Sequence, residues 1–275
     1  MGTLYLVATP IGNFEDLSTR ALRILHQASL IAAEDTRVTR KLLNHFDIHT
    51  PTTSYFEHNK LSKLKSILAQ LNRGDVALVS DAGTPALNDP GYELVRAALE
   101  AGHRVSPVPG PAAPISALIS SGLPTDSFLY LGYLPRKSSE RKKALEQICN
   151  LPHTLIFLET PHRLLDSLND LQTILGDRQV AVARELTKIH EEIWRGKISA
   201  AMEYFKAPRG EFVLVVSGQP IARANRWSEQ QLLAAIEKRK LAGETSAALA
   251  AKLATESGWR RRDIYNMAAI NKMEK

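Results

Sequence analysis

Residues 3–122 alternate between short apolar runs and longer segments in which apolar residues recur every three or four positions. Short apolar runs are typical of buried strands, and the longer period is typical of amphipathic helices. Strands are predicted over 3–8, 29–33, 52–56, 75–80 and 104–110, and helices over 17–28, 36–46, 60–74, 91–102 and 112–122. This alternation predicts a doubly wound parallel sheet.

Three residues mark helix ends in this pattern. Ser18 is expected to cap the first helix through its hydroxyl. Gly74 and Gly102 are expected to close the third and fourth helices. We assign residues 1–120 to an N-terminal α/β domain.

A second α/β segment follows. Residues 123–143 are richer in Pro, Gly and charge and are predicted to form a crossover. Strands are predicted over 154–159, 179–185, 190–196 and 211–218, with a helix near 161–175. The last three strands follow one another closely, which predicts a mixed sheet. We assign this second domain to residues 121–220.

The last part of the chain is helical and basic. A linker over 218–226 leads to three short helices, predicted over 228–240, 245–257 and 260–271. The last two are separated by Gly258-Trp259, a spacing typical of a helix-turn-helix. Residues 221–275 hold eleven Lys or Arg against six Asp or Glu, in a chain whose net charge is +6. A small basic domain over 221–275 predicts an anionic partner, and a merely solubilising surface is the alternative.

Composition excludes several classes of protein. The hydrophobic content of 44% and charged content of 23% are ordinary for globular domains. Cys149 is the one cysteine, which excludes a disulfide scaffold and a cysteine-rich zinc site. The start of the chain lacks the pattern of a signal peptide, and no stretch reaches the ~18 apolar residues of a membrane span. We expect a soluble, cytoplasmic protein without a membrane partner.

Candidate chemistry lies in the loops after the predicted strands of the first domain. In an open parallel sheet, ligands bind beyond the carboxyl ends of the strands. Polar, small or turn-forming segments follow all five strands, at 9–13, 34–37, 57–59, 81–85 and 109–113. Gly83 and Pro85 predict a tight turn that leaves backbone groups available, and Asp81 can accept hydrogen bonds from hydroxyls or an ammonium. We expect the five loops to line one cleft.

Familiar binding motifs are missing from the sequence. Neither G-x-x-x-x-G-K-[ST] nor G-x-G-x-x-G follows a predicted strand, which disfavours NTPases and NAD enzymes. His58, His162 and His190 lack Cys or acidic partners at the spacing of metal ligands, so no metal is predicted. A G-x-S-x-G elbow for a nucleophilic serine is also missing.

Seven segments, in order over residues 3–218, resemble the tetrapyrrole methylase superfamily. They are YLVATPIGNFEDLSTRALRILHQASLIAAEDTR, GDVALVSDAGTPALNDPGYELV, PVPGPAAPISAL, GYLPRKSSERKKAL, TLIFLETPHRLLDSL, VARELTKIHEEIWRG and GEFVLVVSG. Within the superfamily they are similar to enzymes that methylate the ribose 2′-hydroxyl of a cytidine in small-subunit ribosomal RNA, which also carry a basic tail. The resemblance implies a two-domain fold with S-adenosyl-L-methionine in the cleft between the domains. It also implies a homodimer that acts on 16S rRNA, in the assembled small subunit.

The resemblance assigns site residues by motif. The implied cofactor contacts are Pro10, Asp81, Gly83, Thr84, Ala112, Ala113, Leu158 and Ala183. Members of the superfamily that methylate precorrins have a glycine-rich turn after the first strand. Here that turn reads Thr9-Pro10-Ile11-Gly12-Asn13, which argues against a tetrapyrrole substrate.

Methyl transfer from a sulfonium to a hydroxyl is an in-line displacement that needs alignment and removal of a proton. The candidate catalytic residues follow the second and third predicted strands and are Glu34, Asp35, Arg37 and His58. One carboxylate or His58 would accept the proton, and Arg37 would hold a phosphate; a structural Asp35–Arg37 ion pair is the alternative. The candidate RNA-binding residues of the tail are Lys238, Arg239, Lys240, Arg260, Arg261 and Arg262.

Two other functions stay open at this point. A C-methyltransferase acting on a precorrin-like macrocycle would need a wide apolar trough and would not need the basic tail. A non-catalytic nucleic-acid-binding module would use the tail and retain a decayed cleft. The intact Asp81-Ala82-Gly83-Thr84 loop argues against decay.

Overall fold

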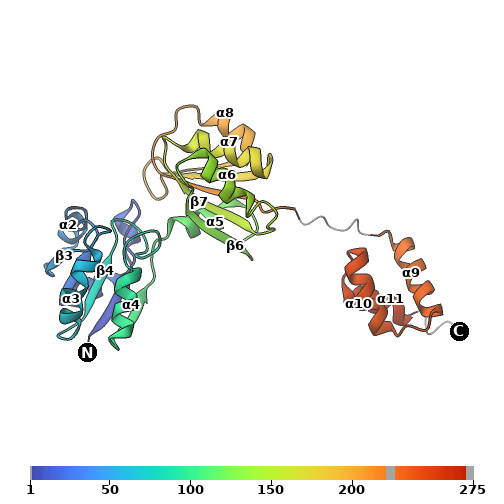
Figure 1. The fold of residues 1–275 in the computed structure, drawn as a ribbon, viewed down its shortest axis with the longest axis horizontal. Coiled ribbons are helices and arrows are strands. Elements are labelled where there is room, and N and C mark those ends of the chain that lie inside the picture. The colour runs from blue at the N-terminus through green and yellow to red at the C-terminus, as the bar shows by residue number, and fades with distance from the viewer. Residues whose placement is uncertain (1, 221–226, 271–275) are drawn as a thin grey trace. The chain divides into compact units, whose positions relative to one another are not determined.

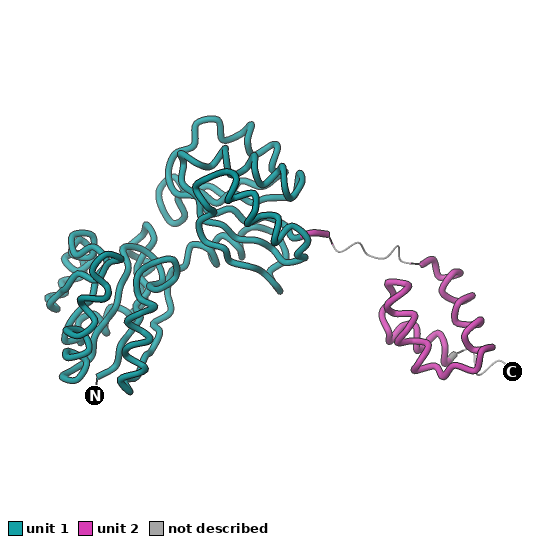
Figure 2. The backbone as a smooth tube through the Cα atoms, in the orientation of Figure 1, with its two compact units in different colours: residues 1–218 teal, residues 219–275 magenta. Residues whose placement is uncertain are grey.

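The computed structural model describes residues 2–220 and 227–270. The chain divides into two compact units, Met1–Gly218 and Gln219–Lys275 (Figure 2). Part of the predicted linker, residues 221–226, and the predicted helix end at 271 lie outside the described residues.

The first sheet has five parallel strands in the order β3-β2-β4-β1-β5 (Figure 1). The strands are β1 (Thr3–Val7), β2 (Leu30–Ala33), β3 (Thr52–Ser54), β4 (Val76–Val79) and β5 (Arg104–Val108). The intervening helices are α1 (Thr19–Gln27), α2 (Thr36–His45), α3 (Lys60–Leu71) and α4 (Tyr92–Glu100). A one-turn 3-10 helix, η1, spans Phe14–Asp16. The predicted parallel α/β sheet is confirmed.

Two hydrophobic clusters cover the two faces of this sheet. Side chains of α1 and α2 pack in one cluster with Val7, Ala77 and Val79. Side chains of α3 and α4 pack in the other with Val76 and Leu78. Adjacent residues of β4 thus point to opposite faces, as the pleat of a strand requires.

The predicted N-cap of the first helix is confirmed, and the predicted end of the third helix is wrong. The Ser18 hydroxyl accepts a hydrogen bond from the Ala21 amide and caps α1, as predicted. The third helix ends at Leu71, with Asn72 as its C-cap, and Gly74 does not close it. A Cβ on Gly74 would instead lie 3.0 Å from the Ser29 hydroxyl oxygen, a tight contact, and Gly74 has no left-handed φ. The Gly74 carbonyl also lies so close to Gly2 that a Cβ on Gly2 would overlap it.

The second sheet is mixed, as predicted, with the order β6-β7-β10-β8-β9. Its strands are β6 (Phe128–Tyr133), β7 (Thr154–Glu159), β8 (Gln179–Arg184), β9 (Glu192–Lys197) and β10 (Phe212–Val216). Only the β6–β7 pair is parallel among the pairs of this sheet. Every residue of β10 is buried, which fits its central place between β7 and β8.

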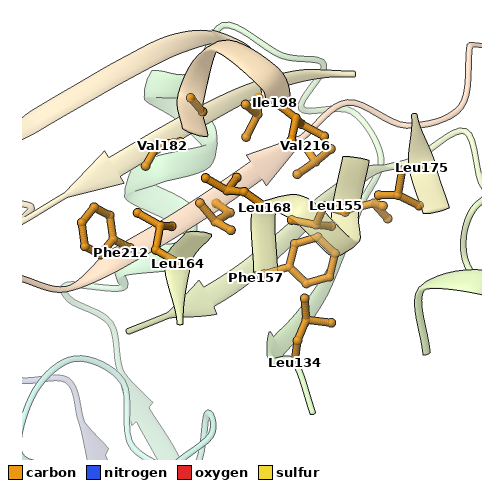
Figure 3. Packing of buried hydrophobic residues seen from close by; sticks show 14 of the residues in the cluster. Leu134, Leu155, Phe157, Leu164, Leu168, Leu175, Val182, Ile198, Phe212 and Val216 are labelled. Atoms are coloured by element: carbon orange, nitrogen blue, oxygen red, sulfur yellow. The ribbon is translucent and has the colours of Figure 1, made fainter. Parts of the chain in front are cut away.

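Helices cover both faces of the second sheet. On one face, α6 (Ser138–Glu146), α7 (Leu164–Leu175) and α8 (Ile198–Tyr204) enclose a core that includes Leu155, Phe157, Leu168, Val182 and Val216 (Figure 3). On the other face lies α5 (Ala113–Ser121), whose Ala117 and Leu118 pack with Ile156 and Val215. The helix that follows β5 in sequence therefore packs on the second sheet.

Two features of the second sheet differ from the prediction. Residues 123–143 are not a plain crossover, because they contain β6 and the start of α6. Gly132 in β6 has φ +60, and the β6–β7 register shifts between Tyr130 and Tyr133, so the strand lacks a regular alternation. The short helix α8, which was not predicted, lies between β9 and β10 in the chain, and β8 lies between these two strands in the sheet.

Unit 2 is a bundle of three helices, α9 (Glu229–Leu241), α10 (Ser246–Ser257) and α11 (Arg261–Ile270). Its own core includes Leu232, Ile236, Leu249, Leu253 and Ile264. Ser228 and Gln231 form a capping box at the start of α9, and Gly258, with φ +69, ends α10. The predicted helical C-terminal region is confirmed.

Across the described ranges, no helix has the length and apolar character needed to span a bilayer.

Candidate active site

A cavity of about 290 Å³ opens at the carboxyl ends of β2 and β4. The first sheet contributes Glu34 and the loop after β4, and the start of α5 contributes Ala112 and Ala113. The second sheet contributes the opposite wall, made of Tyr130, Tyr133, Leu158, Glu159, Glu211, Phe212 and Val213. The loops at the carboxyl edge of the first sheet thus meet the second sheet around one hollow.

Main-chain contacts hold the floor of this cavity. Thr9 and Gly83 exchange two backbone hydrogen bonds, of 2.8 Å from the Thr9 amide and 3.0 Å from the Gly83 amide. Gly83 has φ +79, a conformation that glycine adopts without a steric cost. The Thr84 hydroxyl donates a 3.1 Å hydrogen bond to the carbonyl of Pro111. The loops after β1, β4 and β5 are therefore tied to one another.

The segment between β4 and α4 contains two residues other than glycine that have a positive φ. Ala86 and Asn88 both have φ +66, a left-handed conformation that is uncommon outside glycine and is found often at functional sites. The Asn88 side chain packs directly on Gly132 of β6. The contact is so close that a Cβ on Gly132 would overlap the Asn88 side chain. This contact joins the two walls of the cavity.

Carboxylates dominate the charge of the lining. Glu34, Asp81, Asp89, Glu159 and Glu211 all line the cavity. The Asp81 amide donates a 3.2 Å hydrogen bond to Oε2 of Glu34. The Asp35 amide in turn donates a 2.9 Å hydrogen bond to Oδ1 of Asp81. Main-chain amides thus fix the positions of two of these carboxylates.

Three of these acids are shifted toward the protonated form. Burial raises the pKa of Glu34, and the nearby charges of Asp89, Asp81 and Asp35 raise it further. Loss of solvent raises the pKa of Asp81 and of Asp89 as well. Burial also raises the pKa of Tyr130 to about 12, so its hydroxyl keeps its proton at neutral pH. Ionisable groups with shifted pKa values in a cleft are candidates for proton transfer.

Asp35 and Arg37 form the ion pair that the sequence left as an alternative. The Arg37 guanidinium lies 2.6 Å from Oδ2 of Asp35, and the Asp35 side chain also accepts from the Arg37 amide as the cap of α2. These contacts lower the pKa of Asp35 to about 2. Because its pKa is lowered, Asp35 is a poor proton acceptor. The Arg37 side chain is 87% exposed.

The cavity brings together most of the residues that the resemblance assigned to the cofactor. Those that line it are Asp81, Gly83, Thr84, Ala112, Ala113 and Leu158. Ala183 lines a small adjoining hollow of about 40 Å³ that shares Ile11 and Glu211 with the cavity. Pro10 lines a separate hollow that shares Asp81 with the cavity. His58 is exposed beside Phe56 and is outside the lining of the cavity.

Sequence reasoning missed several lining residues. Asp89 lies in the segment Asn88-Asp89-Pro90-Gly91, which is outside the five loops that the sequence assigned to the cleft. Tyr130 and Tyr133 fall in the stretch that was predicted as a crossover. Glu211 precedes a strand, and no local pattern marks it as part of a site. Among the described residues, no group of His, Cys, Asp or Glu could hold a metal ion.

The candidate RNA-binding residues of unit 2 differ in their surroundings. Arg260, Arg261 and Arg262 are exposed at the start of α11, and Lys238 is exposed on α9. Arg239 is instead paired with Glu256 at 2.8 Å and with Glu244 at 3.6 Å. Its charge is therefore balanced within the bundle.

Comparison with known proteins defines the class of this fold and site. The family model for Tetrapyrrole (Corrin/Porphyrin) Methylases matches residues 3–201. The chain belongs to this family, and such a protein requires a methyl donor.

Among its curated relatives, proteins named Ribosomal RNA small subunit methyltransferase I match nearly the whole chain. The protein of Halalkalibacterium halodurans is 48% identical over 97% of this chain and 94% of its own length. The protein of Synechocystis is 47% identical over 98% of both chains. The protein of Escherichia coli O157:H7 is 45% identical over 97% of this chain and 94% of its own.

Solved structures share the fold at much lower identity. The methyltransferase CobJ aligns with a TM-score of 0.59 and 19% identity, over 79% of this chain and 95% of its own. Uroporphyrin III C-methyl transferase from Thermus thermophilus aligns with a TM-score of 0.55 and 20% identity, over 78% and 97%. At these identities the likeness shows the fold alone.

Proposed function

We propose that this protein is an S-adenosyl-L-methionine-dependent methyltransferase that methylates the ribose 2′-hydroxyl of a cytidine in 16S rRNA. The observation that carries the proposal is the near-complete match, at 45–48% identity, to proteins named Ribosomal RNA small subunit methyltransferase I. An rRNA substrate also supports the cytoplasmic location expected from the sequence.

The cavity fits the proposed cofactor in size and charge. Its volume of about 290 Å³ is close to the lower bound of small-ligand sites, which run from roughly 300 to 1,000 Å³. S-adenosyl-L-methionine carries a sulfonium and an ammonium, and carboxylates near these cations are favourable. The Tyr130 hydroxyl, which keeps its proton at neutral pH, offers a further hydrogen-bond donor.

When bound, the cofactor supplies an electrophilic methyl group, and the protein must remove the hydroxyl proton of the ribose. Glu34 is the candidate that fits this role best, because its raised pKa brings it closer to the working pH of a general base. The Asp81 amide holds Oε2 of Glu34 in place. Asp35 is occupied by Arg37, whose exposed guanidinium can hold a backbone phosphate.

Unit 2 supports an RNA substrate. Arg260, Arg261 and Arg262 are exposed at the start of a helix, where phosphates bind favourably. The Gly258-Trp259 turn between α10 and α11 is stabilised by the Trp259 indole, which donates to the carbonyl of Trp227 over 2.7 Å. From the resemblance we also propose that the substrate is the assembled small subunit and that the protein is a homodimer.

A precorrin C-methyltransferase is less well supported. The turn after β1 reads Thr9-Pro10-Ile11-Gly12-Asn13 in place of a glycine-rich turn, and a macrocycle substrate would not need the exposed arginines of unit 2. The structural neighbours that act on uroporphyrin share only the fold.

The test uses purified protein, tritiated S-adenosyl-L-methionine, and small subunits or naked rRNA from cells that lack this gene. We expect label in small-subunit rRNA at one nucleotide that resists alkaline cleavage, because a 2′-O-methyl group blocks attack by that oxygen. Comparing the two substrates shows whether the assembled subunit is required. Cofactor binding without any label in rRNA would contradict the proposal.

A further inference from the structure

A second hollow, of about 150 Å³, shares the lining residue Asp81 with the cavity. We name it the side pocket. Its walls are formed by Pro10, Phe14, Val38 and Leu42, and its polar lining includes Thr39 and Asp81. It is built from the loop after β1, η1, α2 and the loop after β4, all at the carboxyl edge of the first sheet. Asp81 lines both hollows, so they are neighbours.

The size of the side pocket suits one aromatic ring. A cavity of roughly 150 Å³ in a protein core accommodates a benzene molecule. A pyrimidine base has one six-membered ring, whereas a purine has two fused rings. A volume of about 150 Å³ therefore matches a pyrimidine and is small for a purine.

The walls offer a stacking surface. Phe14 is 39% exposed, although aromatic side chains of this size are usually buried. Its ring is held in place by His45, at 4.8 Å between centroids, and by Phe46, at 6.2 Å. Unstacked RNA bases commonly stack on such fixed aromatic rings.

Polar groups of the side pocket match the edge of a base. Thr39 is 4% exposed, and its hydroxyl has no hydrogen-bond partner within the described part of the chain. A buried hydroxyl without a partner is destabilising, and the edge of a bound base could satisfy it. The Asp81 carboxylate can accept from an exocyclic amino group, which is how acidic side chains recognise cytosine.

We propose that the side pocket binds the pyrimidine base of the nucleotide that is methylated. The base then stacks on Phe14 between Pro10 and Val38, and the attached ribose passes over Asp81 toward Glu34. This inference rests on the proposed function and names the residues that select its substrate.

The test uses full-length protein and small subunits from cells lacking the gene. Val38→Phe fills the side pocket and should lower kcat/KM for the RNA about tenfold or more. Phe14→Ala removes the stacking ring and should lower it by a similar factor, since stacking of one base contributes about 1–3 kcal/mol. Thr39→Val removes the hydroxyl and should lower kcat/KM, whereas Thr39→Ser keeps the hydroxyl and should keep kcat/KM near wild type.

Controls separate this effect from misfolding. Asn44→Phe places the same phenyl group at an exposed position of α2 outside the side pocket, and should leave kcat/KM unchanged. The melting temperature and the Kd of S-adenosyl-L-methionine should stay near wild type in Phe14→Ala, even if Val38→Phe folds poorly. Wild-type rates in both Val38→Phe and Phe14→Ala, in protein that labels rRNA, would overturn the inference.

A direct binding measurement separates this inference from the proposed function. Saturation-transfer NMR with CMP, UMP and AMP reports binding of each mononucleotide without any methyl transfer. We expect a signal from CMP that Val38→Phe abolishes, and weaker signals from UMP, which has no exocyclic amino group for Asp81, and from AMP, which has two fused rings. This result would support the side pocket even if the wild-type protein labelled no rRNA. AMP binding as strong as CMP binding would overturn the inference.

Discussion

The backbone amide of Asp81 donates a hydrogen bond of 3.2 Å to Oε2 of Glu34. The amide belongs to the loop after β4, and the carboxylate follows β2, the strand that pairs with β4. The position of Glu34 is thus set by the sheet itself and not by a flexible partner. Oδ1 of Asp81 is held in the same way by the Asp35 amide.

Glu34→Gln should lower kcat by about 10²–10⁴-fold, because the variant loses the proton acceptor and keeps its shape. Its amide oxygen can still accept from the Asp81 amide, so the Kd of S-adenosyl-L-methionine should change little. Rates under saturating small subunits and calorimetric cofactor titrations measure the two effects. Glu146→Gln, at an exposed glutamate of α6, is the matched control and should have no effect. A wild-type kcat in Glu34→Gln would exclude this residue as the base.

The same variant should be more stable than wild type at neutral pH. Burial raises the pKa of Glu34 above its ordinary value of 4.5, so the folded protein holds this proton more tightly than the unfolded chain. The stabilising contribution is complete below pH 4.5 and is lost as the pH rises through the raised pKa. We expect Glu34→Gln to raise Tm by about 1–3 °C at pH 7.5, since solvent screens this half-buried group. The gain should vanish near pH 4, and a lower Tm at pH 7.5 would contradict the sign.

Gly132→Ala should disturb the cavity through Asn88. The added Cβ would overlap the Asn88 side chain, and overpacking of this kind costs about 1–3 kcal/mol. Gly122→Ala is the matched control, because Gly122 also has a positive φ, +79, but a Cβ there would meet no atom within 4 Å. Urea unfolding and cofactor titration should show a larger loss for Gly132→Ala. Adding Asn88→Gly to Gly132→Ala should recover part of the lost stability. Equal losses in the two alanine variants would show that backbone strain alone causes them.

Replacing Arg260, Arg261 and Arg262 by Ala should make RNA binding weaker and less dependent on salt. Each lost phosphate contact to single-stranded RNA reduces the slope of log K against log salt by about 0.7, so a reduction of about 2 is expected. Filter binding between low and physiological salt measures the slope. Alanine at Lys65, Arg73 and Arg104, three exposed cations of unit 1, makes the same change in net charge and should leave the slope unchanged. An unchanged slope in the first variant would remove α11 from the RNA interface.

Local pattern predicted the first sheet well, because its buried strands are short apolar runs between amphipathic helices. The same reasoning failed at β6, where Gly132 and a register shift interrupt the alternation. It also failed at α8, which has only 7 residues. Short and irregular elements are fixed by packing against their neighbours, which a local window does not contain.

The candidate site was predictable on one wall only. Glu34, Asp81 and Gly83 follow parallel strands, and the carboxyl edge of such a sheet is where ligands bind. Tyr130, Glu159 and Glu211 reach the cavity because the second sheet packs against that edge, a long-range contact with no local signature. Leu158 and Ala183 came from the resemblance and not from any pattern in the residues.

The bridge between Thr9 and Gly83 consists of two main-chain hydrogen bonds and a 3.5 Å hydrogen bond from the Thr9 hydroxyl to the Gly83 carbonyl. None of these hydrogen bonds uses the side chains at positions 10 and 11, so these side chains can change while the backbone keeps its course. The turn after β1 can therefore vary in sequence without losing its link to the loop after β4. A search for a fixed sequence signature at this turn would miss enzymes that share its geometry.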